Sequence, residues 1–247
     1  MEQKVFFNSK SGRVCGILKK YSGNVAVIIC HGLTSSKDSK TGTALRNTLI
    51  DDGITTLSID LYGHGESEGT MEQLTVSKSV ESVVGAYEYL KQNGYDKISL
   101  VGSSFSGSVC IVAATLLDLS AMVLKCPVFD YAELLRYRLK EHGVETWKKD
   151  GKIEVYQTIL GYGIYEDATN LNIKELARKV TCPTLFIHGA GDKMVPPSHS
   201  EEAYKMIHSK EKKLYIIRGA DHFFIHEKHF NEVIKEAHDW LVKFARG

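Results

Sequence analysis

The chain has 247 residues, and its 31 Lys and Arg against 30 Asp and Glu give a formal net charge of +1 at pH 7. This balance provides no broad electropositive surface, which argues against nucleic acid as a partner. Hydrophobic residues make up 43% of the chain, as in an ordinary globular protein, and the length suits one α/β domain with an insertion.

The cysteines are scattered along the chain, odd in number and without a C-x-x-C pair: Cys15, Cys30, Cys110, Cys126 and Cys182. Most of them lie in apolar runs, which predicts buried, reduced thiols in a reducing compartment. No apolar stretch approaches the roughly 18 residues that a membrane-spanning helix needs, and the first residues carry no apolar segment typical of a signal peptide. We therefore expect a cytoplasmic protein with no membrane insertion.

In chain order, residues 3–8 and 12–19 are predicted to form an antiparallel hairpin at a sheet edge. Short, almost continuously apolar runs then recur, as expected for strands covered on both faces, at residues 25–30, 54–59, 98–101, 121–124, 184–187 and 214–217. Between such runs, apolar residues at helical spacing predict helices over residues 76–90 and 230–244. This alternation predicts an α/β fold with a mostly parallel sheet, in which sites form at the carboxyl ends of the strands.

The segment 127–179 breaks the alternation. It is predicted to hold helical fragments and no clear strand, and it contains six of the fourteen Tyr and Trp residues of the chain. Because it lies between two predicted strands, we expect a small inserted cap on a core formed by residues 1–126 and 180–247. Tyr131, Trp147 and Tyr165 are its candidates for substrate binding, since aromatic rings with polar groups suit a pocket wall. The alternative is a surface excursion whose aromatic residues pack on one another.

The stretch Ile98–Gly107 predicts a sharp turn from a strand into a buried helix. Gly102 allows the turn, and Ser104 stands at its apex, so that its hydroxyl points out of the sheet. This is the arrangement of a nucleophile elbow, in which small neighbours let strand and helix pass closely. The alternative is a small polar turn with a serine that caps the helix.

The other predicted strands also end in polar residues. Asp192 follows the strand at residues 184–187, and His222 follows the strand at residues 214–217. An acyl-transfer nucleophile needs a base to take its proton and a carboxylate to orient that base. Ser104, Asp192 and His222 supply these three groups in the chain order Ser, Asp, His, each just after a predicted parallel strand.

Five stretches in this order and spacing resemble those of the α/β-hydrolases over nearly the whole chain, namely residues 31–33, 60–67, 102–107, 188–196 and 219–222. The short chain and small insertion are most similar to the feruloyl/cinnamoyl esterase and monoacylglycerol lipase branches. The resemblance implies the α/β-hydrolase fold, with Ser104 as nucleophile, His222 as base and Asp192 as its orienting acid. It also implies an oxyanion hole formed by the backbone N–H groups of Leu33 and Phe105.

Two positions depart from the pattern of those branches, which have His before the nucleophile and Gly two residues after it. Ser103 and Ser106 occupy these positions here, and each is also an alternative nucleophile. Asp221 is an alternative acid, although its adjacency to His222 makes it hard for its carboxylate to reach the imidazole Nδ1.

Other readings use neighbouring residues. His222, His226 and His229 with Glu227 could indicate zinc, but the spacing is one residue short of an H-E-x-x-H pair. The residues 63–65 could open a dinucleotide loop, but no glycine stands three residues later. His64 and His188 are expected to be structural histidines beside the site.

The sequence therefore predicts a serine carboxylesterase that hydrolyses short- to medium-chain or aromatic esters, of the feruloyl/cinnamoyl type, through an acyl-enzyme. Its expected partner is a small-molecule ester, with no metal and no cofactor. Thioester hydrolysis, acyl transfer and monoacylglycerol lipase activity stay open as alternatives, as does a non-catalytic ligand-binding protein. The oligomeric state also stays open, with a homodimer as one alternative.

Overall fold

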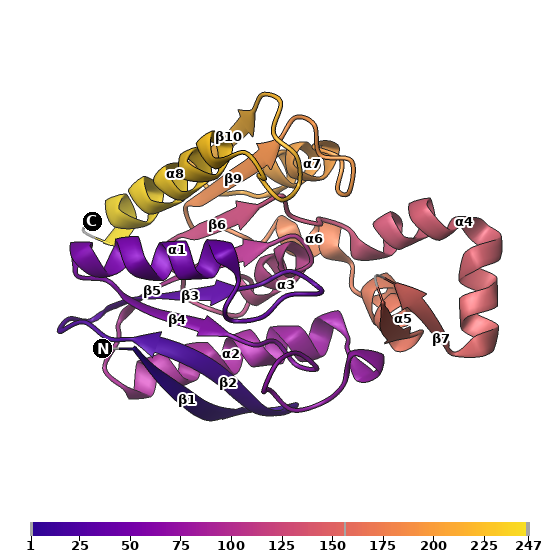
Figure 1. Cartoon of the computed structure of the whole chain (residues 1–247), viewed down its shortest axis with the longest axis horizontal. Coiled ribbons are helices and arrows are strands. Elements are labelled where there is room, and N and C mark those ends of the chain that lie inside the picture. The colour runs from indigo at the N-terminus through magenta and orange to yellow at the C-terminus, as the bar shows by residue number, and fades with distance from the viewer. Residues whose placement is uncertain (1, 156, 246–247) are drawn as a thin grey trace.

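An eight-stranded sheet forms the centre of the molecule in a computed structural model that describes residues 2–155 and 157–245 (Figure 1). Its strand order is β1-β2-β4-β3-β5-β6-β9-β10. The strands are β1 (Glu2–Ser9), β2 (Gly12–Lys19), β3 (Val25–Cys30), β4 (Thr55–Ile59), β5 (Lys97–Ser103), β6 (Met122–Lys125), β9 (Thr184–Gly189) and β10 (Lys212–Ile217). β1 pairs antiparallel with β2, and β2 antiparallel with β4, whereas the six strands from β4 to β10 in this order run parallel to one another.

The predicted hairpin and apolar runs correspond to these strands, and the mostly parallel sheet is confirmed. All five residues of β4 and all four of β6 are buried, as expected for strands that are covered on both faces. Four of the five cysteines are buried as well, and all five are free thiols.

Helices cover both faces of the sheet (Figure 1). The helices are α1 (Lys40–Leu49), η1 (Ile50–Asp52), η2 (Met71–Gln73), α2 (Val76–Gln92), α3 (Ser106–Ala113), α4 (Tyr131–Asp150), α5 (Gly163–Asn170), α6 (Ile173–Ala177), α7 (Ser198–Met206) and α8 (Glu227–Ala245). α1 and α8 share one apolar cluster with the sheet, and α2 and α3 belong to the larger cluster on the other face. The two predicted helices, α2 and α8, are confirmed.

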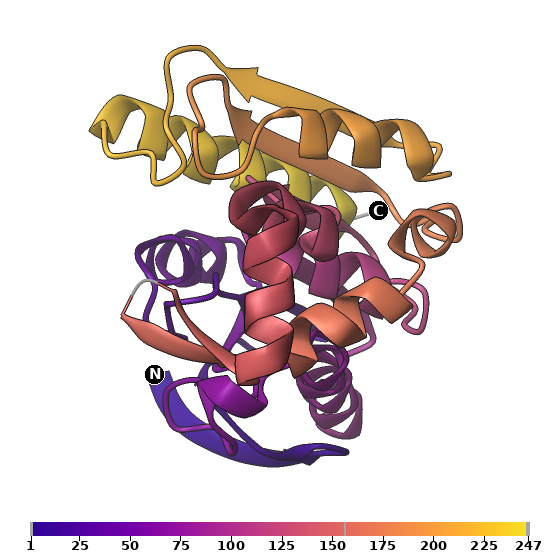
Figure 2. The ribbon, with the colours of Figure 1, turned by 90° about the vertical axis from the view of Figure 1, so that its right-hand side faces the viewer.

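The insertion, residues 127–179, runs from β6 to β9 and lies beyond the carboxyl ends of the parallel strands (Figures 1 and 2). α4 bends at Lys140, whose backbone is non-helical. α6 packs against α3 and α7, and so continues the helical layer on the sheet. A two-stranded sheet of β7 (Lys152–Val155) and β8 (Thr158–Gly161) corrects the expectation of a segment without strands, and Tyr156 lies outside the described residues.

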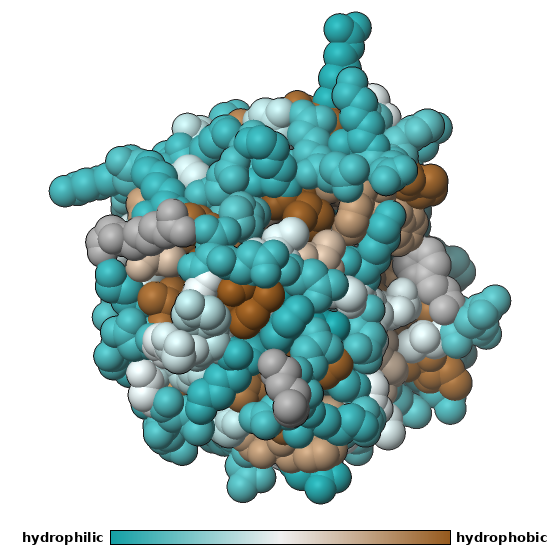
Figure 3. Space-filling view, turned by 60° about the vertical axis from the view of Figure 1, so that its left-hand side comes forward, coloured by the Kyte–Doolittle hydropathy of each residue, from teal (hydrophilic) through white to brown (hydrophobic). Residues whose placement is uncertain are grey.

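The face on the left of Figure 1, away from the insertion, is mostly hydrophilic with small, separate hydrophobic patches (Figure 3). Both described chain ends lie near this side. Across the described residues, no helix is both long enough and apolar enough to cross a membrane. The candidate site lies at the opposite end, beneath the insertion.

Candidate active site

Ser104 stands at a sharp turn between β5 and α3. Its φ of 53° lies in the left-handed region, which a non-glycine residue seldom adopts. The backbones pass closely around it, since a Cβ at Gly107 would lie 2.4 Å from the Cβ of Pro127. The strained turn and its tight surroundings are the geometry that the elbow motif predicts.

The contacts of Ser106 show how the elbow accommodates a residue other than glycine two positions after Ser104. Its side chain is fully buried, and its Oγ accepts a hydrogen bond from the N–H of Ser103 at 2.7 Å. The carbonyl oxygens of Cys30 and Ser103 lie 3.1 and 3.0 Å from the same hydroxyl. This hydroxyl therefore holds the turn against the end of β3, and it does not face the cavity.

Ser104, His222 and Asp192 form a continuous chain of hydrogen bonds. The Ser104 Oγ lies 3.0 Å from Nε2 of His222, and Nδ1 of the same ring lies 2.6 Å from Oδ2 of Asp192. The other carboxylate oxygen, Oδ1, accepts hydrogen bonds from the N–H groups of Met194 and Val195, both at 2.8 Å. The acid is thus fixed by its own loop, and the imidazole is left to link it to the serine.

The electrostatics of Asp192 keep it ionised. Burial alone would raise the pKa of its carboxyl, but hydrogen bonds from His188 and His222 outweigh burial and hold the pKa well below its usual range. His188 is itself fixed, with Nδ1 2.6 Å from Oγ of Ser200 and Nε2 2.9 Å from the carbonyl oxygen of Val195. His188 therefore helps to hold Asp192 in place, which is a structural role, as expected.

Cys126 is a neighbour of this group that the sequence analysis did not assign to the site. Its Sγ and ligand atoms of Asp192 and His222 lie within 4.8 Å of one another. Burial raises the pKa of the Cys126 thiol to about 12, so that it is protonated at neutral pH. Because Asp192 and His222 already bind each other, we interpret this thiol as neutral packing beside the acid.

The loop after β3 approaches the nucleophile closely. A Cβ at Gly32 would lie 3.4 Å from the Cβ of Ser104. Among the described residues, no group accepts a hydrogen bond from the N–H of Leu33 or Phe105. Both N–H groups are thus available near Ser104, as the expected oxyanion hole requires.

Two histidines hold this loop in place. His31 accepts a hydrogen bond from the N–H of Leu61 at 3.1 Å and contacts the carbonyl oxygen of Gly32 at 2.7 Å. Burial, and then the neighbouring His64, lower the pKa of His31 to about 3, so the ring is neutral. His64 packs edge-on against His31 and contacts the carbonyl oxygen of Leu33. His64 is therefore structural, as expected.

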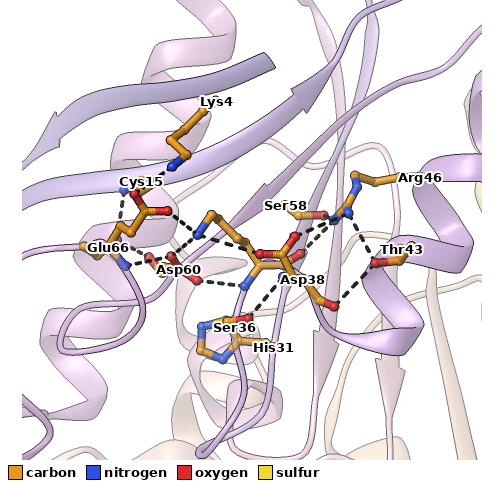
Figure 4. A network of polar contacts seen from close by, with 12 residues as sticks. Lys4, Cys15, His31, Ser36, Asp38, Thr43, Arg46, Ser58, Asp60 and Glu66 are labelled. Carbon is orange, nitrogen blue, oxygen red and sulfur yellow. Dashed lines mark hydrogen bonds and ion pairs between the residues drawn. The ribbon is translucent and has the colours of Figure 1, made fainter. Parts of the chain in front are cut away.

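A buried ionic network lies beneath the same loop (Figure 4). The Lys37 ammonium lies 2.9 Å from Oδ2 of Asp60 and 3.0 Å from Oε1 of Glu66. Asp60 also accepts a hydrogen bond from the Lys37 N–H at 2.7 Å, and Arg46 donates to the Lys37 carbonyl oxygen at 2.7 Å. The Asp60 carboxylate also packs against the backbone of Gly65, where a Cβ would lie 2.1 Å from Oδ2. Gly63 lies against the backbone of Thr70, where a Cβ would be 2.6 Å from the carbonyl oxygen, so local packing accounts for both glycines without a dinucleotide.

The alternative acid and the histidine cluster have local roles. Asp221 accepts hydrogen bonds from the N–H groups of Phe223 at 2.8 Å and Ile225 at 3.4 Å, so that its carboxylate closes its own turn. His226 and His229 pack ring against ring at 5.6 Å. Neither histidine belongs to the set of possible metal ligands among the described residues, which joins Cys126, Asp192 and His222.

A cavity of about 580 Å³ opens above Ser104. Its walls combine residues of the core loops and the insertion, and the apolar ones are Leu33, Phe105, Val128, Tyr131, Leu134, Leu135, Val155, Met194, Val195 and Phe223. Tyr131 lines the cavity, as expected, and packs edge-on against Phe105 at 5.1 Å. The apolar part of the walls is thus mainly aliphatic, in contrast to the predicted aromatic lining.

Trp147 and Tyr165 are not among the residues that line the cavity, which corrects their assignment as substrate-binding residues. Their rings lie 6.1 Å apart, and each also packs against Tyr162. Trp147 is 1% exposed and donates a hydrogen bond to the carbonyl oxygen of Leu160 at 3.2 Å. These aromatic residues therefore form the core of the insertion.

The chain has the α/β-hydrolase fold, and two families match parts of it. The family described as "alpha/beta hydrolase fold" matches residues 25–142, and the family described as "Serine aminopeptidase, S33" matches residues 160–229. The sheet, the elbow and the loop positions of Ser104, Asp192 and His222 agree with this assignment.

Individual relatives share about a quarter of the sequence or less. A thermostable monoacylglycerol lipase from Bacillus sp. (strain H-257) is 25% identical over 236 residues, which cover 91% of this chain and 93% of that protein. Protein ABHD12B from Homo sapiens is 25% identical over 74% of this chain, which spans only 50% of that protein. The structure of Est1E from Butyrivibrio proteoclasticus with ferulic acid bound superposes with a TM-score of 0.87, at 22% identity over 98% of this chain and 100% of that one.

Proposed function

We propose that the protein is a serine carboxylesterase that forms an acyl-enzyme on Ser104. The observation that carries the proposal is the chain from Ser104 through His222 to Asp192, with contacts of 3.0 and 2.6 Å, at the floor of a cavity. A hydroxyl, a base and a fixed carboxylate in this order are what acyl transfer needs. Relatives with hydrolase names agree with the reaction class.

In the first half of the reaction, Ser104 Oγ attacks the ester carbonyl carbon while its proton passes to Nε2 of His222. The carbonyl oxygen becomes an oxyanion, to which the N–H groups of Leu33 and Phe105 donate hydrogen bonds. His222 then gives the proton to the departing alcohol oxygen, and the acyl group stays on Ser104. Asp192 holds the imidazole in the required tautomer and stabilises its cation.

In the second half, water takes the place of the alcohol. Nε2 of His222 removes a proton from the water, whose oxygen attacks the acyl carbon, and the returning proton releases Ser104 with a free carboxylic acid as product. The buried, ionised Asp192 carboxylate stabilises the imidazolium twice in each cycle.

The cavity supports the proposed substrate class. Its volume of about 580 Å³ and its mainly aliphatic walls suit a short- to medium-chain acyl group. Tyr131 and Phe105 add aromatic surface next to Ser104, and Est1E holds ferulic acid, so aromatic esters of the cinnamoyl type belong to the proposed range. Thioesters use the same catalytic groups and are the alternative substrates.

The proposal is tested with a fluorophosphonate probe and a panel of esters, thioesters and amides. We expect covalent labelling of the wild type at Ser104, none of Ser104→Ala, and faster turnover of esters than of thioesters or amides. A wild-type protein that resists the probe and turns over no ester would overturn the proposal and favour a ligand-binding role. A better turnover of thioesters would change the substrate class and leave the mechanism intact.

A further inference from the structure

Lys125 is a buried cation next to the nucleophile. It is the last residue of β6, pairs in register with Ser103 of β5, and accepts a hydrogen bond from the Ser104 N–H at 2.9 Å through its carbonyl oxygen. The residue is 9% exposed, and its side chain lines the cavity. Lys125 thus borders the cavity above Ser104, and its ammonium lies close to the backbone of His222.

This ammonium has no anionic partner among the described residues, where no carboxylate oxygen lies within 4.0 Å of it. Its Nζ lies 3.5 Å from the carbonyl oxygen of His222, at the limit of a hydrogen bond, and 5.0 Å from the centre of the Phe224 ring. The nearest carboxylates that act on it, Asp192 and Asp221, are bound by their own loops.

Lys37 provides an internal comparison. It is also buried, at 6% exposed, but its ammonium is shared by two carboxylates at 2.9 and 3.0 Å. Burial would lower the pKa of Lys37, yet these carboxylates raise it above its ordinary value. For Lys125, burial lowers the pKa because no such partner is present. The charge of Lys37 is thus balanced by two carboxylates, whereas no carboxylate of the described residues balances the charge of Lys125.

The charge distribution of the cavity also favours an anion. Three cationic residues, Lys40, Lys125 and Arg138, contribute to its lining, which contains no carboxylate among the described residues. Lys40 lies over the Phe230 ring at 4.0 Å, and Arg138 donates a hydrogen bond to the carbonyl oxygen of Met194. Both are more exposed than Lys125, so only Lys125 combines a charge with desolvation.

We propose that Lys125 binds a carboxylate carried by the acyl part of the substrate, so that the preferred esters are half-esters of short dicarboxylic acids. This inference rests on the function proposed above and narrows its substrate class. A single ammonium in apolar surroundings balances one negative charge, which favours a carboxylate over a doubly charged phosphate. Because the Lys125 ammonium lies 3.5 Å from the carbonyl oxygen of His222, whose ring contacts Ser104, few carbon atoms separate the carboxylate from the scissile carbonyl.

The reaction of such a half-ester is the same displacement. Ser104 Oγ bonds to the ester carbonyl carbon, the bond to the alcohol oxygen breaks, and His222 protonates the departing alcohol. The acyl-enzyme then carries a free carboxylate on the Lys125 ammonium. Water cleaves the acyl bond and releases a dicarboxylate, in which the former ester group is a second carboxylate.

Binding to Ser104→Ala, which cannot turn substrate over, tests the inference separately from catalysis. Saturation-transfer NMR would compare monomethyl succinate and monomethyl glutarate with the corresponding neutral dimethyl esters. We expect the better half-ester to bind about tenfold more tightly than its neutral counterpart, as one hydrogen bond between charged groups provides. Lys125→Met in the same background should bring the ratio close to one, and Lys125→Arg should keep part of the preference.

Lys40→Met is the matched control, because it removes the same charge from the same cavity at a more exposed position. We expect it to retain the preference for the half-ester. Equal binding of charged and neutral esters by Ser104→Ala would overturn the inference, as would a preference that survives Lys125→Met or disappears in Lys40→Met. If Lys125→Met does not fold, Lys125→Gln gives the same comparison with a neutral polar side chain.

Failure of the proposed function would have a different signature. Labelling of wild-type Ser104 by the fluorophosphonate without a preference for half-esters would overturn only the role of Lys125. A preference for half-esters without labelling would support the carboxylate site and overturn the esterase mechanism.

Discussion

At the scale of single residues, Asp192 and Asp221 are two carboxylates near one histidine with different tasks. Asp192 binds Nδ1 of His222 at 2.6 Å, whereas Asp221 accepts from backbone N–H groups of its own turn. We expect Asp192→Asn to lower kcat by about 10⁴-fold, because the amide favours the wrong imidazole tautomer. Asp221→Asn should change kcat far less. Steady-state kinetics on one ester decide between them, and a larger loss in Asp221→Asn would contradict the assignment.

Ser106 is the residue at which the elbow departs from its family. Its hydroxyl accepts a hydrogen bond from the Ser103 N–H and lies against the Cys30 carbonyl oxygen, so Ser106→Gly should be destabilising. We expect Ser106→Ala to lower the free energy of unfolding by about 1 to 3 kcal/mol, the cost of removing a buried hydrogen-bond partner. Urea denaturation measures this cost. Ser108→Ala is the control, since within the described residues that hydroxyl donates only to the carbonyl oxygen of Phe105, the N-cap of α3, at 3.1 Å. A smaller loss for Ser106→Ala than for Ser108→Ala would show that the hydroxyl does not hold the elbow.

The buried Lys125 ammonium should lower the stability of the folded protein at neutral pH. Its pKa in the folded state lies below the ordinary value of 10.5, because burial disfavours the ammonium. The unfolded chain therefore binds the proton more tightly, and the stability of the wild type should rise as pH increases through the folded pKa towards 10.5. We expect Lys125→Met to have the higher Tm at pH 7, with the difference shrinking in that alkaline window. A Tm of Lys125→Met that is lower at pH 7, or a difference that is independent of pH, would argue against a desolvated ammonium.

At the scale of elements, the strands that carry the site were predictable because burial on both faces dictates their composition. The run at residues 184–187 became β9, and the run at 25–30 became β3 without a change of bounds. The loops after these strands therefore fell at one edge of the sheet, which brought Ser104, Asp192 and His222 together. Chain order and strand type were enough for this part of the site.

The insertion was less predictable for a physical reason. β7 and β8 have only four residues each and alternate between exposed and half-buried positions over much of their length, so no apolar run marks them. Aromatic residues suit a pocket wall and a small core equally well, and the sequence could not decide between the two. The sequence could not distinguish Lys37 from Lys125 either, since only the tertiary structure shows which lysine contacts a carboxylate.

The division of labour in the insertion can be tested with two alanine variants. Leu135 lines the cavity, whereas Trp147 lies in the core of the insertion. We expect Leu135→Ala to favour longer acyl chains, with a gain of about tenfold for the added methylenes, because each is worth about 1 to 3 kcal/mol in such a pocket. Trp147→Ala should lower stability by about 3 to 5 kcal/mol and leave the ranking of chain lengths unchanged. Thermal denaturation and kcat/KM for acetyl to octanoyl esters separate these effects. If Trp147→Ala changed the ranking and Leu135→Ala did not, the aromatic cluster would be part of the pocket after all.

At the scale of the whole molecule, the ionic network of Lys4, Lys37, Asp60 and Glu66 joins segments that lie far apart in the sequence. Lys4 of β1 binds Glu66 at 2.8 Å, and Glu66 and Asp60 from the loop after β4 bind Lys37 from the loop after β3 (Figure 4). The edge hairpin, the centre of the sheet and the loop that carries Leu33 are thus connected through the buried pair of Lys37 and Asp60 and the exposed pair of Lys4 and Glu66. Stability and the geometry of the site should therefore depend on the same contacts.

Removing one charge of this network should be worse than removing the pair. Asp60→Asn leaves the Lys37 ammonium buried without its closest carboxylate, and we expect a loss of about 3 to 5 kcal/mol in the free energy of unfolding. The double variant Lys37→Met/Asp60→Asn should recover part of this loss, because no uncompensated cation remains. Glu66→Gln is the control, since its side chain is 45% exposed and a surface ion pair is worth about 1 kcal/mol or less. Guanidinium denaturation of the wild type, Lys37→Met, Asp60→Asn and the double variant yields the coupling energy, and Glu66→Gln is measured beside them. Additive losses for Lys37 and Asp60 would mean that the loop after β3 is held by its backbone hydrogen bonds and its two histidines, with no net contribution from the buried ion pair.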